Sequence, residues 1–264
     1  MNKKIMIFRI GITLVVAFIL FYLTLPAINL TNPGFYGYLF CIFLVYFFSS
    51  WIKLFDTRNI IKNVKTLPRN VLVMIGSVFG VFVLIMVVNF ILSPVFNAKS
   101  WSRRIVIDQT HEFNDDIALV NYQSLPLLDK DSSRKLGDRV MGQLPELVSQ
   151  FYVSDLYTQI NYNADIVRVT PLEYNGFIKY LNNRKNGVKG YITVNSVTGD
   201  ADLVKLDKGM RYMPSAYFFD NLDRHLRFKY PTVIFDDEKF EIDNDGNPYW
   251  VVPVLKYTGI EMLE

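Results

Sequence analysis

The sequence predicts a membrane α plus α+β protein: three N-terminal transmembrane helices followed by an extracytoplasmic domain of repeated helix and β-hairpin units. Three long apolar stretches between residues 10 and 92 contain no Asp, Glu, Lys or Arg. From about residue 96 onward, short segments with the apolar periods of helices and strands alternate with polar turns. We therefore divide the chain into a three-span membrane anchor, residues 1–95, and an exterior domain, residues 96–264.

Each apolar stretch has about the 20 residues that a helix needs to cross a hydrocarbon core. The stretches run over residues 10–28, 35–52 and 71–92. A cleavable signal peptide is the alternative for the first stretch, because Lys3, Lys4 and Arg9 precede it. That stretch is long, however, and residues 25–29 lack a small-x-small cleavage pattern, which favours a retained span.

Basic residues near the span ends predict the orientation. Three lie before the first span, none lies between spans one and two, and five lie between spans two and three against the single acid Asp56. We expect the N-terminus and the second linker to be cytoplasmic, which places residues 96–264 outside. Lys99, Arg103 and Arg104 lie on the opposite side, outnumbered eight to three.

Charge and cysteine content narrow the class of protein. The net charge of +3 divides into +7 before residue 96 and −4 after it. The exterior domain therefore lacks the basic character of a nucleic-acid-binding protein. The single cysteine, Cys41, lies in the second span, so the exterior domain has no disulfide. A bacterial cytoplasmic membrane and cell envelope suit such a domain better than a eukaryotic secretory route.

The first part of the exterior domain predicts an extended segment, a helix and a hairpin. Residues 101–128 look extended, with a short strand at 104–107. Asp131 or Ser132 is expected to cap a helix that Pro145 kinks or ends. Residues 156–162 and 166–170 then flank the turn Asn163-Ala164-Asp165, the pattern of a β-hairpin.

Two further cycles of helix and hairpin follow. Pro171 is expected to start a helix to about Asn186, with Leu172, Phe177, Ile178 and Leu181 on its apolar side. Strands at 191–195 and 201–206 then flank a turn that contains Gly199. A helix at 215–228 precedes strands at 233–242 and 249–255, which flank a turn that contains Gly246. The two glycines lie 47 residues apart, which suggests a duplicated unit.

These two turns carry a family resemblance. The segments 190–200 and 240–252 resemble the hairpin of PepSY-type domains, small extracytoplasmic modules built from a helix and an antiparallel hairpin. The resemblance covers about residues 172–256. It implies a fold and a tendency to bind polypeptide or wall components, and it supplies no catalytic residues.

The residues suited to chemistry are few. A triad around His111 or His225 lacks the Gly-x-Ser-x-Gly turn that would support it, so we interpret both histidines as surface residues. Glu241, Asp243 and Asp245 imitate part of a calcium loop, but Val252 stands where the bidentate Glu belongs. We predict no catalytic residue, no cofactor and no metal. The tyrosines are expected to be half-buried core residues, with an aromatic ligand groove as the alternative.

Gly76 and Gly80 form a GxxxG pattern, which predicts close helix packing through span three, within the chain or in a homo-oligomer. No ionisable residue lies within a span, which disfavours a channel or transporter acting alone.

The last predicted strand, residues 249–255, would leave an open sheet edge. We expect either that the chain continues beyond Glu264 or that this strand pairs with a partner. The preferred hypothesis is a non-enzymatic, membrane-anchored envelope protein whose exterior domain binds a protein or wall component. The alternatives are a membrane-anchored hydrolase of envelope polymers and an accessory subunit of a transport complex.

Overall fold

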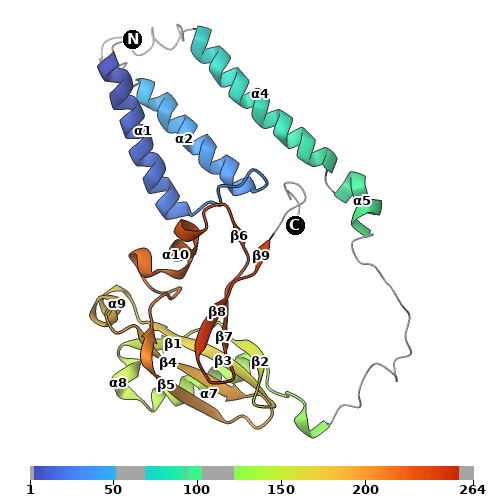
Figure 1. The fold of residues 1–264 in the computed structure, drawn as a ribbon, viewed down its shortest axis with the longest axis vertical. Helices are drawn as coiled ribbons and strands as arrows, with labels where there is room; N and C mark the ends of the chain where they lie inside the picture. Colours follow the sequence, from blue (N-terminus) through green and yellow to red (C-terminus); the bar gives the residue numbers. More distant parts are fainter. Residues whose placement is uncertain (1–2, 52–68, 93, 103–121, 256–264) are drawn as a thin grey trace. The chain divides into compact units, whose positions relative to one another are not determined.

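The computed structural model describes residues 3–51, 69–92, 94–102 and 122–255 (Figure 1). The chain forms two compact units. One contains residues 1–108, 230–234 and 256–264, and the other contains residues 109–229 and 235–255. We refer to them as the helical unit and the α+β unit, and we describe each by itself.

The helical unit contains a hairpin of two apolar helices. Helix α1 (Lys3–Thr24) packs against α2 (Pro33–Trp51), and the Tyr38 hydroxyl donates to the Ala17 carbonyl oxygen at 3.1 Å. At the other end of the pair, the Arg9 guanidinium lies 4.7 Å from the Tyr46 ring centroid and donates to the Ser49 hydroxyl. Helices α4 (Arg69–Leu92) and α5 (Pro94–Ser102) follow.

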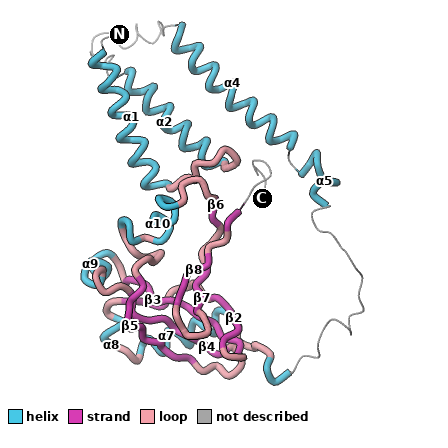
Figure 2. Tube along the Cα trace, in the orientation of Figure 1, coloured by secondary structure: helices cyan, strands magenta, loops and turns pink. Residues whose placement is uncertain are grey.

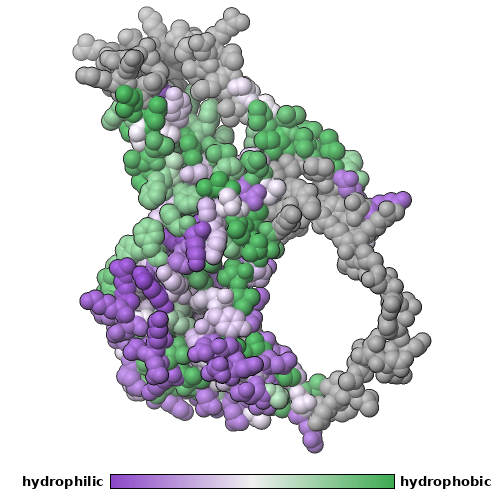
Figure 3. All heavy atoms as spheres, viewed as in Figure 1, coloured by the Kyte–Doolittle hydropathy of each residue, from purple (hydrophilic) through white to green (hydrophobic). Residues whose placement is uncertain are grey.

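The expectation of three transmembrane helices is met in part. Helices occupy all three predicted stretches, but among the described residues only Ile7–Thr24 is long and apolar enough to pass as a membrane span. Pro33–Ser49 and Phe79–Val88 are apolar over shorter lengths. Large apolar side chains are exposed along α1 and α4, such as Phe8, Leu14, Phe79 and Leu84, and hydrophobic residues cover both helices in Figure 3.

The loop after α1 is bonded to a distant part of the chain within the same unit. The Ile28 amide donates to the Pro231 carbonyl oxygen at 2.7 Å, and Asn29 Nδ2 donates to the Thr232 carbonyl oxygen at 3.0 Å. The end of α1 is thus joined to residues 230–234, which interrupt the sequence of the α+β unit.

The α+β unit is built on an antiparallel sheet with the strand order β1-β3-β4-β5, to which β2 adds by pairing with β3 (Figure 2). The elements from residue 122 onward are η2 (Tyr122–Ser124), α7 (Lys130–Gly142), α8 (Pro145–Val148), β1 (Phe151–Val153), β2 (Thr158–Tyr162), β3 (Asp165–Tyr174), α9 (Phe177–Asn183), β4 (Val188–Asn195), β5 (Ala201–Met210), η3 (Phe218–Asp220), α10 (Leu222–Lys229), β6 (Ile234–Phe235), β7 (Lys239–Ile242), β8 (Pro248–Val251) and β9 (Val254–Leu255).

Strand β3 corrects the prediction of a helix that starts at Pro171. The strand continues through this proline to Tyr174, and α9 begins only at Phe177. Proline cannot donate to the ladder, so a central strand normally excludes it. Here the Pro171 carbonyl accepts from the Ser154 amide, and the Thr170 hydroxyl donates at 2.9 Å to the Ser154 carbonyl. The hydroxyl thereby replaces the missing amide.

The hairpin predictions are confirmed. Tyr162 pairs with Asp165 around Asn163 and Ala164, both with positive φ, and Val194 pairs with Ala201 around the turn of Gly199. The cap of α7 is Asp129 rather than Asp131 or Ser132, since its carboxylate accepts from the Ser132 amide at 2.7 Å.

The third cycle is more broken than the sequence predicts. The helix expected at 215–228 is divided into η3 and α10, and Arg224 N donates to the Asn221 side chain between them. The strand expected at 249–255 is also divided, since β8 pairs with β7 and β9 pairs with β6. The expectation of one continuous final strand is therefore wrong, while β8 and β9 each have a single strand partner among the described residues, so the open edge stays a prediction. The strand expected at 104–107 and residues 256–264 lie outside them.

Two apolar clusters lie on opposite faces of the sheet. Met141, Leu172, Tyr180, Ile192 and Val194 belong to the cluster that α7 covers. Val167, Val169 and Tyr191 belong to the other cluster, where Phe240 and Ile242 of β7 pack against them. Because successive side chains of a strand point to opposite faces of the sheet, the neighbours Tyr191 and Ile192 belong to different clusters. The β7–β8 hairpin thus lies over the sheet face that the helix leaves open.

Candidate functional site

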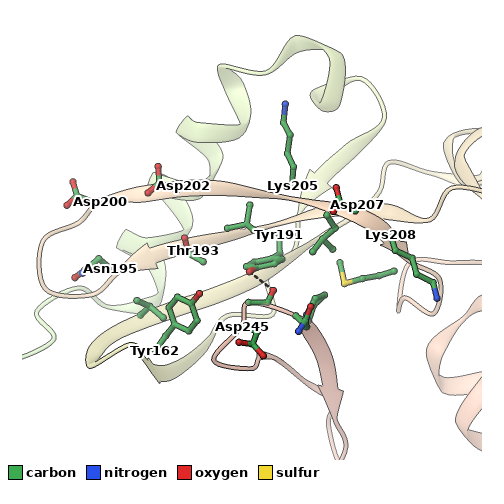
Figure 4. A pocket seen from close by; sticks show the side chains of 18 residues that line it. Tyr162, Tyr191, Thr193, Asn195, Asp200, Asp202, Lys205, Asp207, Lys208 and Asp245 are labelled. Carbon is green, nitrogen blue, oxygen red and sulfur yellow. Dashed lines mark hydrogen bonds between the residues drawn. The ribbon is translucent and has the colours of Figure 1, made fainter.

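A groove of about 830 Å³ lies between the outer part of the β4–β5 hairpin and the turn that joins β7 to β8. Tyr162 and Tyr191 line it from the sheet, and residues 245–248 line it from the turn. Figure 4 shows these tyrosines close to the Asp245 turn, with Asp200 and Asp202 along the outer strand. Two tyrosines thus border this groove, and an aromatic ligand groove stays a prediction.

A hydrogen bond from Tyr191 fixes the turn to the sheet. Its hydroxyl donates to the Gly246 carbonyl oxygen at 2.8 Å, and its buried ring lies 5.8 Å from that of Phe240. Burial, together with the nearby Tyr162 and Asp243, raises the pKa of Tyr191 to about 12, so the phenol keeps its proton at neutral pH. Gly246 has φ +81°, and a Cβ there would lie 3.2 Å from the Tyr191 hydroxyl. The lack of a side chain at Gly246 therefore lets the Tyr191 hydroxyl come close to the backbone of the turn.

The Asp243 carboxylate holds the turn from within. It accepts from the Asp245 amide at 3.0 Å, from the Asn247 amide at 2.8 Å and from Asn247 Nδ2 at 3.0 Å. The hydrogen bonds from Asn247 lower the pKa of Asp243, so it is ionised at neutral pH. These contacts account for the Asp243 carboxylate, and the described residues contain no group of three or more His, Cys, Asp or Glu side chains placed to hold a metal ion.

A large bulge in β5 shapes the other wall. Val188 pairs with Met210 and Gly190 pairs with Lys205, so one residue of β4 lies opposite residues 206–209 of β5. All four residues of the bulge line the groove. Bulges bend a strand out of its ladder, and they occur frequently beside binding sites.

The charged side chains of the groove are mainly acidic. Four aspartates, Asp200, Asp202, Asp207 and Asp245, line it together with Lys205 and Lys208. In the strand order of the described sheet, β5 is the outermost strand next to β4. The groove therefore runs beside a strand edge that is open to further pairing, and its charge favours a cationic ligand.

Neither His225 nor the glycines of the GxxxG pattern line this groove. His225 on α10 stacks on Tyr212 with ring centroids 3.7 Å apart. Burial and the cations Lys229 and Arg211 lower the pKa of His225, whereas a carboxylate that orients a catalytic base would raise it. His111 lies outside the described residues. Gly76 and Gly80 both lie exposed on α4, and their role in helix packing stays a prediction.

No protein-family model matches this chain, and neither a curated protein nor a solved structure matches it significantly. The resemblance to PepSY-type hairpins therefore stays a prediction. The sequence did not reveal the groove, because its two walls are joined by the contact of Tyr191 with Gly246, 55 residues apart.

Proposed function

We propose that this chain is a non-enzymatic, membrane-anchored protein of the bacterial cell envelope, whose exterior α+β unit binds an extended basic polypeptide segment. The groove beside β5 carries this proposal, because it combines an open strand edge with aspartate side chains and two tyrosines. An extended peptide can add to a free edge through its backbone, and the side chains of the groove then select its sequence.

The exposed helices support the membrane placement. Soluble proteins rarely expose large contiguous apolar surfaces, and α1 and α4 expose them over most of their described length. With 19 residues, α2 is about 29 Å long, close to the thickness of a hydrocarbon core of roughly 30 Å. The packing of α1 on α2 favours a retained first span over a cleaved signal peptide.

The bond between the α1–α2 loop and residues 231–232 supports the proposed orientation. These two segments must lie on the same side of the membrane. If α1 spans, the N-terminus lies on the opposite side from the α+β unit. The chain can return to the side of the α1–α2 loop only if α2 and α4 both cross or neither does, and their apolar length favours crossing by both.

Impermeant thiol labelling of whole cells tests this orientation. In a Cys41→Ser background, a cysteine that replaces the exposed Thr198 is expected to label, and one that replaces Asn63 is expected to label only after permeabilisation. Labelling of both variants after permeabilisation shows that each is expressed and that each cysteine is reactive. Labelling at residue 63 in intact cells, without labelling at residue 198, would show that the proposed orientation is inverted.

Peptide binding to the full chain in lipid nanodiscs tests the groove. We expect an extended peptide of alternating Lys and Val to bind more tightly than one of alternating Glu and Val. Asp202→Lys with Asp207→Lys is expected to weaken binding of the basic peptide by about thirtyfold, since each reversal exchanges an attraction on the order of 0.5 kcal/mol for a similar repulsion, about 2 kcal/mol for the pair. Fluorescence anisotropy at low and high salt measures both effects.

The matched control is Asp131→Lys with Asp138→Lys, which changes the net charge equally on α7, the helix that covers the other face of the sheet. Equal loss of binding in this control, or equal affinity for the two peptides, would exclude the groove as a basic-peptide site. Soluble cell-wall fragments serve as a competing ligand. Their binding in place of the basic peptide would assign the groove to a wall component.

The observed geometry does not favour the hydrolase alternative. The described histidine, His225, stacks on Tyr212, and the positive charges of Lys229 and Arg211 lower its pKa. The buried carboxylate of Glu173 accepts from the hydroxyls of Ser154 and Tyr152, at 2.6 and 2.7 Å, and Ser154 is itself buried from solvent. A substrate would not reach this serine.

A further inference from the structure

Helix α9 presents its apolar side to solvent instead of to the core. The exposed fractions of Phe177, Ile178 and Leu181 are 42%, 68% and 48%, whereas Tyr180 is fully buried. The sequence predicts the opposite for the first three residues. A helix face with this composition is normally covered, so its exposure points to a binding surface.

The segment that contains η3 extends this apolar face. Tyr217, Phe218 and Phe219 are all exposed, and the Phe177 ring lies 5.0 Å from that of Tyr217 and 6.0 Å from that of Phe218. We call these three residues together with Phe177, Ile178 and Leu181 the aromatic surface. The aromatic surface combines residues of α9 with residues of the segment before α10, which are distant in sequence and adjacent in the structure.

Phe218, whose side chain is exposed, has a strained backbone. Its φ is +54°, a conformation that aromatic residues rarely adopt. Arg224 Nη1 donates to its carbonyl oxygen at 3.1 Å, and the next residue but one, Asp220, is buried and bonded to Tyr180, Arg184 and Arg211. Strain that is held in place by surrounding contacts is characteristic of functional segments.

Basic side chains accompany the aromatic surface. Lys179, Arg184 and Lys185 lie on or just after α9, and four more basic residues lie on β5's C-terminal extension and on α10: Arg211, Arg224, Arg227 and Lys229. These seven belong to a region whose net charge is −4. The acids among these elements are Asp220, which is paired with two arginines, and Asp223. Positive charge thus outweighs negative charge on the elements that carry the apolar side chains.

We propose that the aromatic surface docks on the anionic lipid headgroups of the membrane that carries the helical unit. Phe, Tyr and Leu side chains surrounded by Lys and Arg have the composition of interfacial membrane-binding surfaces. Basic residues are attracted to an anionic leaflet, and the acidic remainder of the domain is repelled by it, so this charge pattern also selects one orientation. The inference rests on the membrane placement proposed above.

The short segment between Phe218 and Pro231 limits how far the aromatic surface can lie from the bilayer, whatever the arrangement of the two units. Pro231, whose carbonyl is bonded to Ile28 just after α1, lies 13 residues from Phe218. Eight of the intervening residues form α10, about 12 Å long, so Phe218 lies within roughly 30 Å of Pro231. The chain is therefore short enough to bring the aromatic surface to the membrane that carries α1, and a lipid surface offers negative charge and an apolar interior together.

Depth-dependent fluorescence quenching in nanodiscs tests the docking. The full chain with Cys41→Ser receives one environment-sensitive label, at a cysteine that replaces Ile178, Thr198 or Val15. The Thr198 position is the control, because it lies at the opposite end of the β4–β5 ladder from Arg211, roughly 20 Å away. Nitroxide-bearing lipids are then added to nanodiscs of phosphatidylglycerol with phosphatidylcholine, or of phosphatidylcholine alone.

We expect the label at residue 178 to be quenched several-fold more than the label at residue 198 in the anionic nanodiscs. The difference should shrink in phosphatidylcholine alone and with Lys179→Glu plus Lys185→Glu. The matched pair Lys130→Glu plus Lys135→Glu on α7 should leave it unchanged. Equal quenching at residues 178 and 198, with strong quenching at residue 15, would overturn the docking alone. Weak quenching at residue 15 would overturn the membrane placement as well.

Discussion

Asp220→Asn is expected to destabilise the α+β unit by about 2 to 3 kcal/mol, because it removes the charge on which three side chains converge. The carboxylate is 2% exposed and accepts from the Tyr180 hydroxyl at 2.8 Å, from Arg184 Nε at 2.7 Å and from Arg211 Nε at 2.9 Å. The loss stays below that of a fully buried ion pair, since the arginine side chains remain 48% and 66% exposed and can be hydrated.

Urea unfolding of the full chain in detergent measures this effect. With Trp51→Phe and Trp101→Phe, the remaining Trp250 reports on the α+β unit, where its Nε1 donates to the Tyr212 carbonyl oxygen. Asp223→Asn is the control. Desolvation raises the pKa of Asp223 against the opposing effect of Arg224 and Arg227, so neutralising it should cost little. Similar losses of unfolding free energy in both variants would show that the ion pairs of Asp220 do not contribute to stability.

The pH dependence has a definite sign. Burial by itself raises the pKa of Asp220, but the hydrogen bonds from Tyr180, Arg184 and Arg211 outweigh it, and the net pKa is lowered. A lowered pKa in the folded state stabilises the fold above the usual aspartate pKa of about 3.9, and this stabilisation is lost as the pH falls through the lowered value. The difference between wild type and Asp220→Asn should therefore be constant from pH 7 to about 5 and should shrink below about 4.

Local sequence signals predicted the hairpins because each turn is determined by a few neighbouring residues. Asn163 and Ala164 adopt positive φ, and glycines at 199 and 246 do the same with φ of 82° and 81°. Asn195 and Asp243 each accept two or more backbone amides within their own turn. Such contacts span at most five residues, so no knowledge of the tertiary fold was needed.

The errors arose where a distant partner decides the local structure. Pro171 reads as a helix start, yet the Thr170 hydroxyl supplies the donor that lets β3 continue. The helix expected at 215–228 is broken at Asn221, directly after Asp220. The partners of Asp220 are Tyr180 in α9 and Arg184 just after it. Tyr180, which is bonded to Asp220, is buried, whereas Ile178 on the same helix is exposed. Periodicity identifies an apolar helix face, but it does not say whether the protein or another surface covers that face.

The bulge of β5 provides the last prediction, because it depends on a backbone contact that admits no side chain. A Cβ at Gly209 would lie 2.1 Å from the Asn186 carbonyl oxygen and 2.9 Å from the Gly187 carbonyl carbon, and Gly187 itself has φ +71°. Gly209→Ala must therefore push apart the two chain segments that close the β4–β5 ladder at Val188 and Met210. We expect a destabilisation of about 3 kcal/mol, at the upper end of the range for overpacking, because backbone atoms cannot move aside as a flexible side chain can.

Gly142→Ala is the matched control, since its Cβ would meet no atom within 4 Å at the C-terminal end of α7. Its stability should stay within about 0.5 kcal/mol of wild type. Residues 206–209 also line the groove, so Gly209→Ala should weaken binding of the basic peptide even at temperatures where the unit stays folded. Urea unfolding and peptide anisotropy on the same samples separate the two effects. A Gly209→Ala protein with wild-type stability and unchanged affinity would mean that the bulge is not held by this contact and does not shape the groove.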